Sequence, residues 1–190
     1  MPLTDIVRFA VGAGATILLV WAAVSDVRTR RIPNLSVIAL IALFVPWAMA
    51  GDLAGVLSAL EAGGIALAVT FVLYLSKVFG AGDSKLFTAC ALYAGMGYLP
   101  FLALAMVLTG GVIALISLAS QPQRALVMFT MRGKGDYGRG VPYGVAVAVG
   151  AMVAIWGNLG GVIDPYGYGG PTPVTSHAIA KALSHPRTEP

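Results

Sequence analysis

Six apolar runs divide this chain, and they constrain its fold more than any other feature. They lie at about residues 6–25, 35–50, 55–76, 84–97, 99–119 and 141–162. A helix needs about 20 residues to cross a bilayer, with a range of about 17–25. The first, third, fifth and sixth runs reach this length, the second is marginal and the fourth is short. The pattern predicts an all-α, polytopic membrane protein with six transmembrane helices, and Gly95, Gly97 and Pro100 predict a tight turn between runs four and five.

The composition supports the membrane class. Only 11% of the residues are charged and the mean hydropathy is +0.85, whereas soluble domains carry roughly 25% charged residues. No stretch combines a basic face with aromatic residues, so nucleic acid is not an expected partner. The single cysteine, Cys90, lies in an apolar run, which argues against a disulfide framework or a cysteine-based metal site. We expect neither a metal nor a cofactor.

Basic residues predict the orientation in the membrane. Most of the 12 lysines and arginines fall in alternate loops, which the positive-inside rule makes cytoplasmic. Both termini are then outside, and residues 1–164 form one six-helix membrane domain. The stretch 165–190, rich in Gly, Pro, Ser and Thr, is expected to be a flexible extracytoplasmic tail. The basic loop residues are Arg28, Arg30 and Arg31, then Lys77 and Lys85, then Arg124, Arg132, Lys134 and Arg139.

Two aspartates, Asp26 and Asp83, lie at the ends of apolar segments on the predicted cytoplasmic side. A carboxylate near bilayer depth is costly, so it is a candidate for function. Two carboxyl groups that share one water can divide the roles of acid and base, because like charge prevents both from ionising. The pair is typical of an aspartic protease dyad.

The residues beside the two aspartates are suited to shaping their loops. Gly80 and Gly82 precede Asp83, and glycine permits close approach of the backbone and positive φ. Pro33 suits the start of the second helix, and Asn34 can cap it. A lone Gly-x-Gly-Asp arises by chance in Gly-rich membrane proteins, and an aspartate after a helix is commonly a solvated cap. The interpretation as an aspartic dyad therefore rests on the two motifs occurring together on the same predicted side of the membrane.

The combined pattern resembles the type IV prepilin peptidase family, and most closely the short Flp (Tad-type) prepilin peptidases. It spans about residues 6–162. The resemblance implies an aspartic endopeptidase of the bacterial cytoplasmic (inner) membrane that removes prepilin leaders at the cytoplasmic face, with Asp26 and Asp83 as its catalytic residues. The matching residues are Asp26 followed by Ile32-Pro33-Asn34, then Gly80-Ala81-Gly82-Asp83-Ser84-Lys85-Leu86, and Val141-Pro142-Tyr143-Gly144.

The resemblance also bears on a second activity and on partners. Larger members carry paired cysteine motifs that are associated with N-methylation of the mature pilin. This chain has only Cys90, so peptidase activity alone is expected. The expected partners are a small prepilin or pseudopilin and membrane lipid, and the sequence leaves homo-oligomer formation open.

Several other residues have two interpretations. Lys85 can pair with Asp83, hold the leader or anchor the chain by the positive-inside rule. Pro142 and Tyr143 are candidate substrate contacts, although interfacial tyrosines are common. Glu61 can be a proton relay or a structural residue near the outer interface.

The main alternative function is a small proton- or ion-coupled membrane transporter that uses Asp26, Asp83 and Glu61. A relay needs acids spread through the depth of the membrane, whereas a dyad needs two acids together on one side. A more distant alternative is a presenilin-like aspartyl protease, which shares Gly-x-Gly-Asp but has more spans and a different first aspartate motif.

Overall fold

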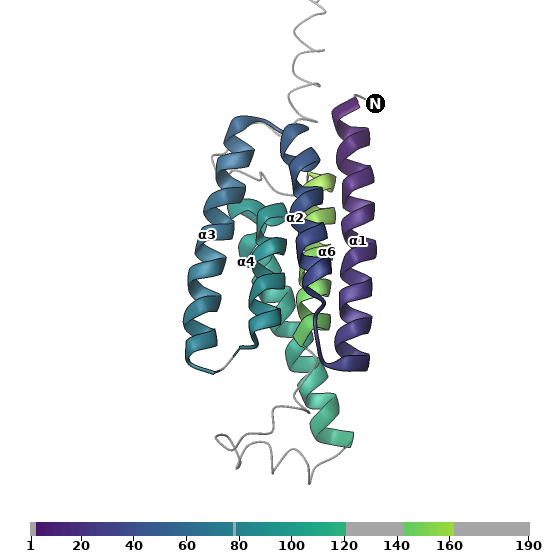
Figure 1. Cartoon of the computed structure of the whole chain (residues 1–190), viewed down its shortest axis with the longest axis vertical. Helices are drawn as coiled ribbons and strands as arrows, with labels where there is room; N and C mark the ends of the chain where they lie inside the picture. Colours follow the sequence, from purple (N-terminus) through teal and green to yellow (C-terminus); the bar gives the residue numbers. More distant parts are fainter. Residues whose placement is uncertain (1–2, 78, 121–142, 162–190) are drawn as a thin grey trace, which may run out of the picture.

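The computed structural model describes residues 3–77, 79–120 and 143–161, and its elements there are all helices (Figure 1). The predicted all-α class is confirmed. Within these ranges, four helices are long and apolar enough to cross a membrane, whereas α2 is shorter. The elements are α1 (Leu3–Thr29), α2 (Asn34–Met49), α3 (Leu53–Leu75), α4 (Ala81–Ser120) and α6 (Tyr143–Gly160).

The long element α4 turns back on itself at Gly95, whose backbone is non-helical (φ 61°, ψ −179°). After the turn, the Tyr98 hydroxyl donates to the Gly157 carbonyl near the end of α6, at 2.7 Å. Further along, Gly110 lies beside Tyr143 at the start of α6. The segment 96–120 therefore runs antiparallel to α6, back toward the end where α4 begins (Figure 1). The two arms of α4 correspond to the predicted fourth and fifth runs, while the count of six membrane spans and their orientation stay predictions.

The start of α2 differs from the prediction in one detail. Asn34 does not cap the helix: it is the first helical residue and is exposed. Pro33 takes the capping position with an extended backbone, and its carbonyl accepts from the Ser36 hydroxyl at 2.7 Å and from the Ser36 N–H at 3.0 Å. The capping prediction was wrong because the chain enters the helix one residue earlier than an Asn34 cap requires.

The turns after α1 and α3 are built alike. Arg30 and Lys77 adopt left-handed backbone angles, with φ of 55° and 54°. The Arg30 N–H donates to the Asp26 carbonyl at 2.9 Å, and the Lys77 N–H donates to the Tyr74 carbonyl at 2.9 Å. These bonds satisfy carbonyl groups that the helix ends would otherwise leave unpaired. Both turns direct the chain toward the residues that surround Asp26 and Asp83.

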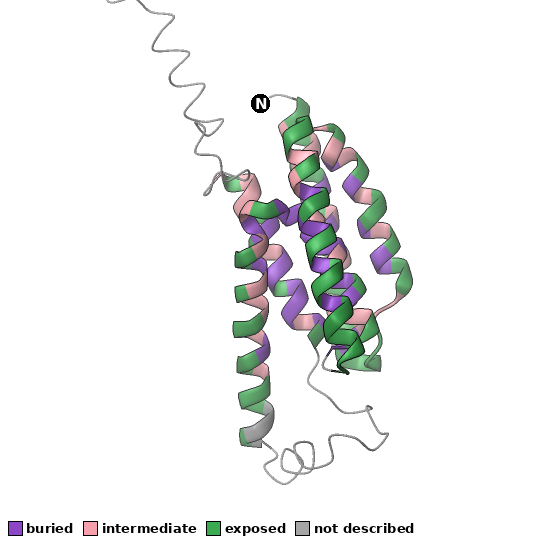
Figure 2. Ribbon diagram, turned by 90° about the vertical axis from the view of Figure 1, so that its left-hand side faces the viewer, coloured by how far each residue is buried: buried purple, intermediate pink, exposed green. Residues whose placement is uncertain are grey.

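Small residues form much of the core, which lets the helices approach closely. A Cβ atom on Gly150 of α6 would lie only 2.6 Å from the Leu102 carbonyl oxygen of α4. Close backbone contacts of this kind are typical of helix packing in membranes. Buried residues face inward and exposed residues face outward (Figure 2). The exposed residues include many large apolar side chains. The fully buried alanines are Ala15, Ala22, Ala62, Ala91, Ala94, Ala146, Ala151 and Ala154.

Candidate active site

Asp26 lies in the last turn of α1, and its side chain is only 7% exposed. The backbone N–H of Gly144, in the first turn of α6, donates to its Oδ2 atom at 2.9 Å. The first N–H groups of a helix have no partner within the helix and carry partial positive charge, so a carboxylate suits this position. A Cβ atom on Gly144 would lie 2.8 Å from Oδ2 and 3.0 Å from Cγ of Asp26. The start of α6 can approach this carboxylate so closely only because residue 144 is glycine.

Asp83 lies in the first turn of α4 and is half-buried. Its Oδ2 atom lies 2.8 Å from the position that a Cβ atom on Gly80 would occupy. A Cβ atom on Gly82 would lie 3.4 Å from the Ile32 Cβ atom, so the α1–α2 loop packs on the start of α4. The predicted close approaches are therefore found at both glycines. The predicted positive φ is not, because among the described glycines only Gly95 and Gly161 have it.

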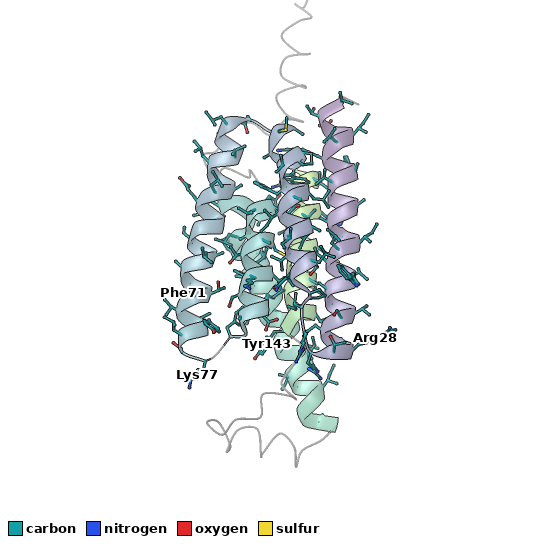
Figure 3. All side chains as sticks on the ribbon, in the orientation of Figure 1. Arg28, Phe71, Lys77 and Tyr143 are labelled. Carbon is teal, nitrogen blue, oxygen red and sulfur yellow. The ribbon has the colours of Figure 1, made fainter. Side chains whose placement is uncertain are left out.

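The two aspartates lie at the same end of the bundle. Asp83 lies close enough to Asp26 for their charges to interact. Arg30, in the turn after α1, also lies within range of the Asp26 charge. Figure 3 shows Tyr143, Arg28 and Lys77 at this same end. The site thus combines one anchored, buried carboxyl group with one half-buried carboxyl group, and two such groups in different surroundings can differ in proton affinity.

Two aromatic residues that precede Gly80 and Gly144 in the sequence pack against each other. The rings of Phe79 and Tyr143 lie with their centroids 6.0 Å apart. Phe79 is buried, whereas Tyr143 is 40% exposed and is the residue before Gly144. The exposed ring of Tyr143 is therefore available to a chain that approaches Asp26.

The remaining predicted residues are less closely involved. Lys85 is exposed, and no ion pair joins it to Asp83, although the structure describes both residues. Pro142 lies outside the described residues, as do residues 121–141 and the predicted tail 165–190. Glu61 is exposed on α3, one turn from Ser58, whose hydroxyl accepts from the Met96 N–H beside the α4 turn at 3.0 Å. Glu61 therefore lies toward the end of the bundle away from Asp26 and Asp83.

Sequence reasoning did not assign a role to Gly144, Phe79 or Ser84. The Ser84 hydroxyl donates to the Gly80 carbonyl at 3.0 Å and lies 3.4 Å from the Thr70 carbonyl, which ties the start of α4 to α3. The sequence feature that could have indicated a role for Gly144 is its place directly after a tyrosine at the start of an apolar run. Its contact with Asp26 joins residues 118 positions apart, and local pattern does not reveal such a contact.

The comparisons with known proteins gave one match. A family model described as the type IV leader peptidase family matches residues 13–115, which is more than half of the chain and includes Asp26, Asp83 and the turn at Gly95. Neither the curated proteins nor the solved structures gave a match. Among the described residues, no group of three or more His, Cys, Asp and Glu residues is arranged to hold a metal ion.

Proposed function

Because the chain belongs to the type IV leader peptidase family, we propose that it is an aspartic endopeptidase in which Asp26 and Asp83 are the catalytic residues. Membership makes the chain a peptidase, and its long apolar helices are those of a membrane protein. The observation that supports the aspartic mechanism is that the two carboxyl groups lie at one end of the bundle, close enough for their charges to interact. One of them is fixed by the Gly144 N–H.

The proposed reaction uses one water held between the two carboxyl groups. The ionised member of the pair takes a proton from the water, and the protonated member donates its proton to the carbonyl oxygen of the scissile peptide. The oxygen of the water bonds to the carbonyl carbon and gives a tetrahedral intermediate. The C–N bond then breaks as the carboxyl group that took the water proton gives it to the amine nitrogen, and the other carboxylate takes a proton from a hydroxyl of the intermediate, which restores the pair. The Gly144 N–H occupies Oδ2 of Asp26, so Oδ1 is the atom that we assign to the water.

The proposed substrate is the N-terminal segment of a small Flp-type prepilin or pseudopilin. Its apolar helix would lie along the enzyme in the bilayer, with the leader junction at the end that holds Asp26 and Asp83. Tyr143, exposed beside Asp26, is the proposed contact for the unwound junction. We place this end at the cytoplasmic face of a bacterial inner membrane, so that both the leader and the water come from the cytoplasm.

Methyl transfer is not part of the proposal. The paired cysteine motifs that accompany it in larger family members need more than one cysteine, and this chain has only Cys90. Cys90 is itself 1% exposed in the helical core. Ion-coupled transport is less well supported, because Asp26 and Asp83 lie at the same end of the bundle, and Glu61 is exposed on the outside of α3.

The decisive experiment is cleavage of a purified Flp-type prepilin by the enzyme in liposomes, read by mass spectrometry. Asp26→Asn and Asp83→Asn should each abolish leader removal, because each leaves one carboxyl group without its counterpart. Both variants should still insert, since Asn is similar in size to Asp. Glu61→Gln is the matched control and should keep most of its activity. Cleavage at the wild-type rate by Asp26→Asn would disprove the dyad, and an inactive but well-folded Glu61→Gln would favour a relay role.

A further inference from the structure

An arginine is held in place at the end of the bundle opposite Asp26 and Asp83. Arg8, in α1, places its guanidinium carbon 5.4 Å from the centroid of the Trp47 ring of α2. A Cβ atom on Gly51, just after α2, would lie 2.7 Å from the terminal Nη2 atom of Arg8. The guanidinium group therefore lies against the indole ring and passes over a residue that has no side chain. This arrangement fixes it between α1 and the turn that joins α2 to α3.

Arg8 also has an unused donor. Its Nε atom is buried, and no described residue accepts a hydrogen bond from it. Arg8 forms no ion pair with a described carboxylate, although Asp5 lies one turn earlier on α1. A buried donor without an acceptor is costly, and a charged one more so. The site therefore calls for an acceptor from outside the described residues.

A small cavity of about 30 Å³ adjoins Arg8, and it is lined in part by Trp47, Gly51, Ser58, Tyr93 and Asn158. The other polar groups of its lining already have partners. The Tyr93 hydroxyl donates to the Leu40 carbonyl at 2.6 Å, Asn158 donates to the Tyr93 carbonyl at 3.2 Å, and the Ser58 hydroxyl accepts from Met96. The cavity has room for about two waters, which can accept from the buried Nε atom. A larger anion would instead bind the terminal nitrogens of Arg8 at the rim, where Gly51 is exposed.

We propose that Arg8, at the rim formed by Trp47 and Gly51, binds the phosphate group of an anionic phospholipid. Arg8 lies five residues from the start of α1, about 8 Å along the axis at about 1.5 Å per residue. That depth, together with a tryptophan, is typical of the membrane interface. Phospholipid phosphates are the anions present there, and the guanidinium group binds phosphate through paired N–H donors. The lipid belongs to the leaflet at the end of the bundle away from Asp26.

The distribution of basic residues between the two ends supports a specific anion-binding site at the end that holds Arg8. Arg8 is the one basic residue there among those that the structure describes. The remaining described basic residues lie at the other end or beside its turns, namely Arg28, Arg30, Arg31, Lys77 and Lys85. Among the described residues, Arg8 is therefore the only cation that can hold an anion at this end. An anion retained at the other end would draw on several cations and would survive the loss of any one of them.

The test is native mass spectrometry of the full-length protein, released from a mild detergent after incubation with phosphatidylglycerol. The wild-type protein should retain one lipid. Arg8→Gln should weaken retention by about tenfold or more, as expected for a lost hydrogen bond to a charged group. Arg28→Gln, which makes the same charge change at the opposite end of α1, is the matched control and should retain the lipid. Addition of inorganic phosphate should not displace the lipid, and displacement would assign the site to a soluble anion instead.

A second variant keeps the proposal testable if Arg8→Gln does not fold. Gly51→Ala leaves every charge in place but adds a Cβ atom where the Arg8 terminal nitrogen lies. Because a flexible side chain can move aside, the fold should survive while the guanidinium group shifts and lipid retention falls. Retention by Gly51→Ala or by folded Arg8→Gln at the wild-type level would overturn the proposal and leave Arg8 bonded to water alone.

Discussion

The contact between Gly144 and Asp26 shows how one residue without a side chain fixes another with a charge. The Gly144 N–H reaches Oδ2 at 2.9 Å, and both residues are buried. Asp26 cannot turn away from α6 without losing this bond, and α6 cannot approach it with a larger residue at position 144. The orientation of one carboxyl group in the proposed dyad therefore depends on the glycine.

Gly144→Ala should lower kcat by about 10- to 100-fold with a smaller change in KM, because a displacement of about 1 Å at a catalytic group can cost 100-fold. The added methyl group would lie 2.8 Å from Oδ2, so the carboxyl group must move. The measurement is steady-state prepilin cleavage. Gly64→Ala is the matched control, since no atom lies within 4 Å of a Cβ atom there. Equal kcat values for the two variants would show that the Gly144 contact does not position Asp26.

The two aspartates could be predicted as a pair, but their surroundings could not. Asp26 and Asp83 stand out because charge is rare in apolar runs and because the basic loops assign both to one side. The Asn34 cap failed because Pro33 already takes the capping position and Asn34 is the first helical residue. The roles of Gly80 and Gly82 depend on contacts with Asp83 and Ile32, and these contacts exist only in the folded chain.

At the scale of helices, apolar runs predicted where the elements lie but not where each one ends. The predicted runs 6–25 and 55–76 correspond to α1 at Leu3–Thr29 and α3 at Leu53–Leu75. Helix α1 continues past its apolar run, so Asp26 is part of the helix and not of the loop. The predicted turn near Gly95, Gly97 and Pro100 falls at Gly95, which adopts positive φ. Glycine adopts that angle at little steric cost, which is why the sequence signal was sufficient there.

Contact between α4 and α6 should depend on Gly150, because a Cβ atom there would meet the backbone of Leu102 at 2.6 Å and of Met106 at 3.2 Å. Backbone atoms cannot move aside as a side chain can. Gly150→Ala should therefore destabilise the fold by about 1–3 kcal/mol, the usual cost of overpacking. Gly111→Ala in α4 meets no atom within 4 Å and should be neutral or stabilise by up to about 1 kcal/mol. Thermal unfolding in detergent measures both, and equal midpoints would contradict the packing argument.

At the scale of the whole molecule, the two ends of the bundle differ in charge and in polar chemistry. The end with Asp26 and Asp83 carries the described basic residues other than Arg8, and Figure 3 shows Arg28 and Lys77 there. The opposite end carries Arg8 together with Asp5, Asp52 and Glu61. Length and hydropathy predicted helices that can span a membrane, because those properties depend on composition alone. Length and hydropathy do not predict how α4 and α6 pack. That packing depends on which glycines of one helix lie against the backbone of the other.

The charge difference predicts that the end with Asp26 and Asp83 faces the cytoplasm. Single cysteines at Ser76 and Ala54, both exposed, mark the two ends in a Cys90→Ala background. The Cys90→Ala change excludes background labelling. Because Cys90 is only 1% exposed, the change does not alter the surface of the protein. Ser76→Cys should react with a membrane-impermeant thiol reagent only after the cells are opened. Ala54→Cys should react when the outer barrier alone is permeabilised. The reverse pattern would place both aspartates away from a cytoplasmic leader and would contradict the proposed site of cleavage.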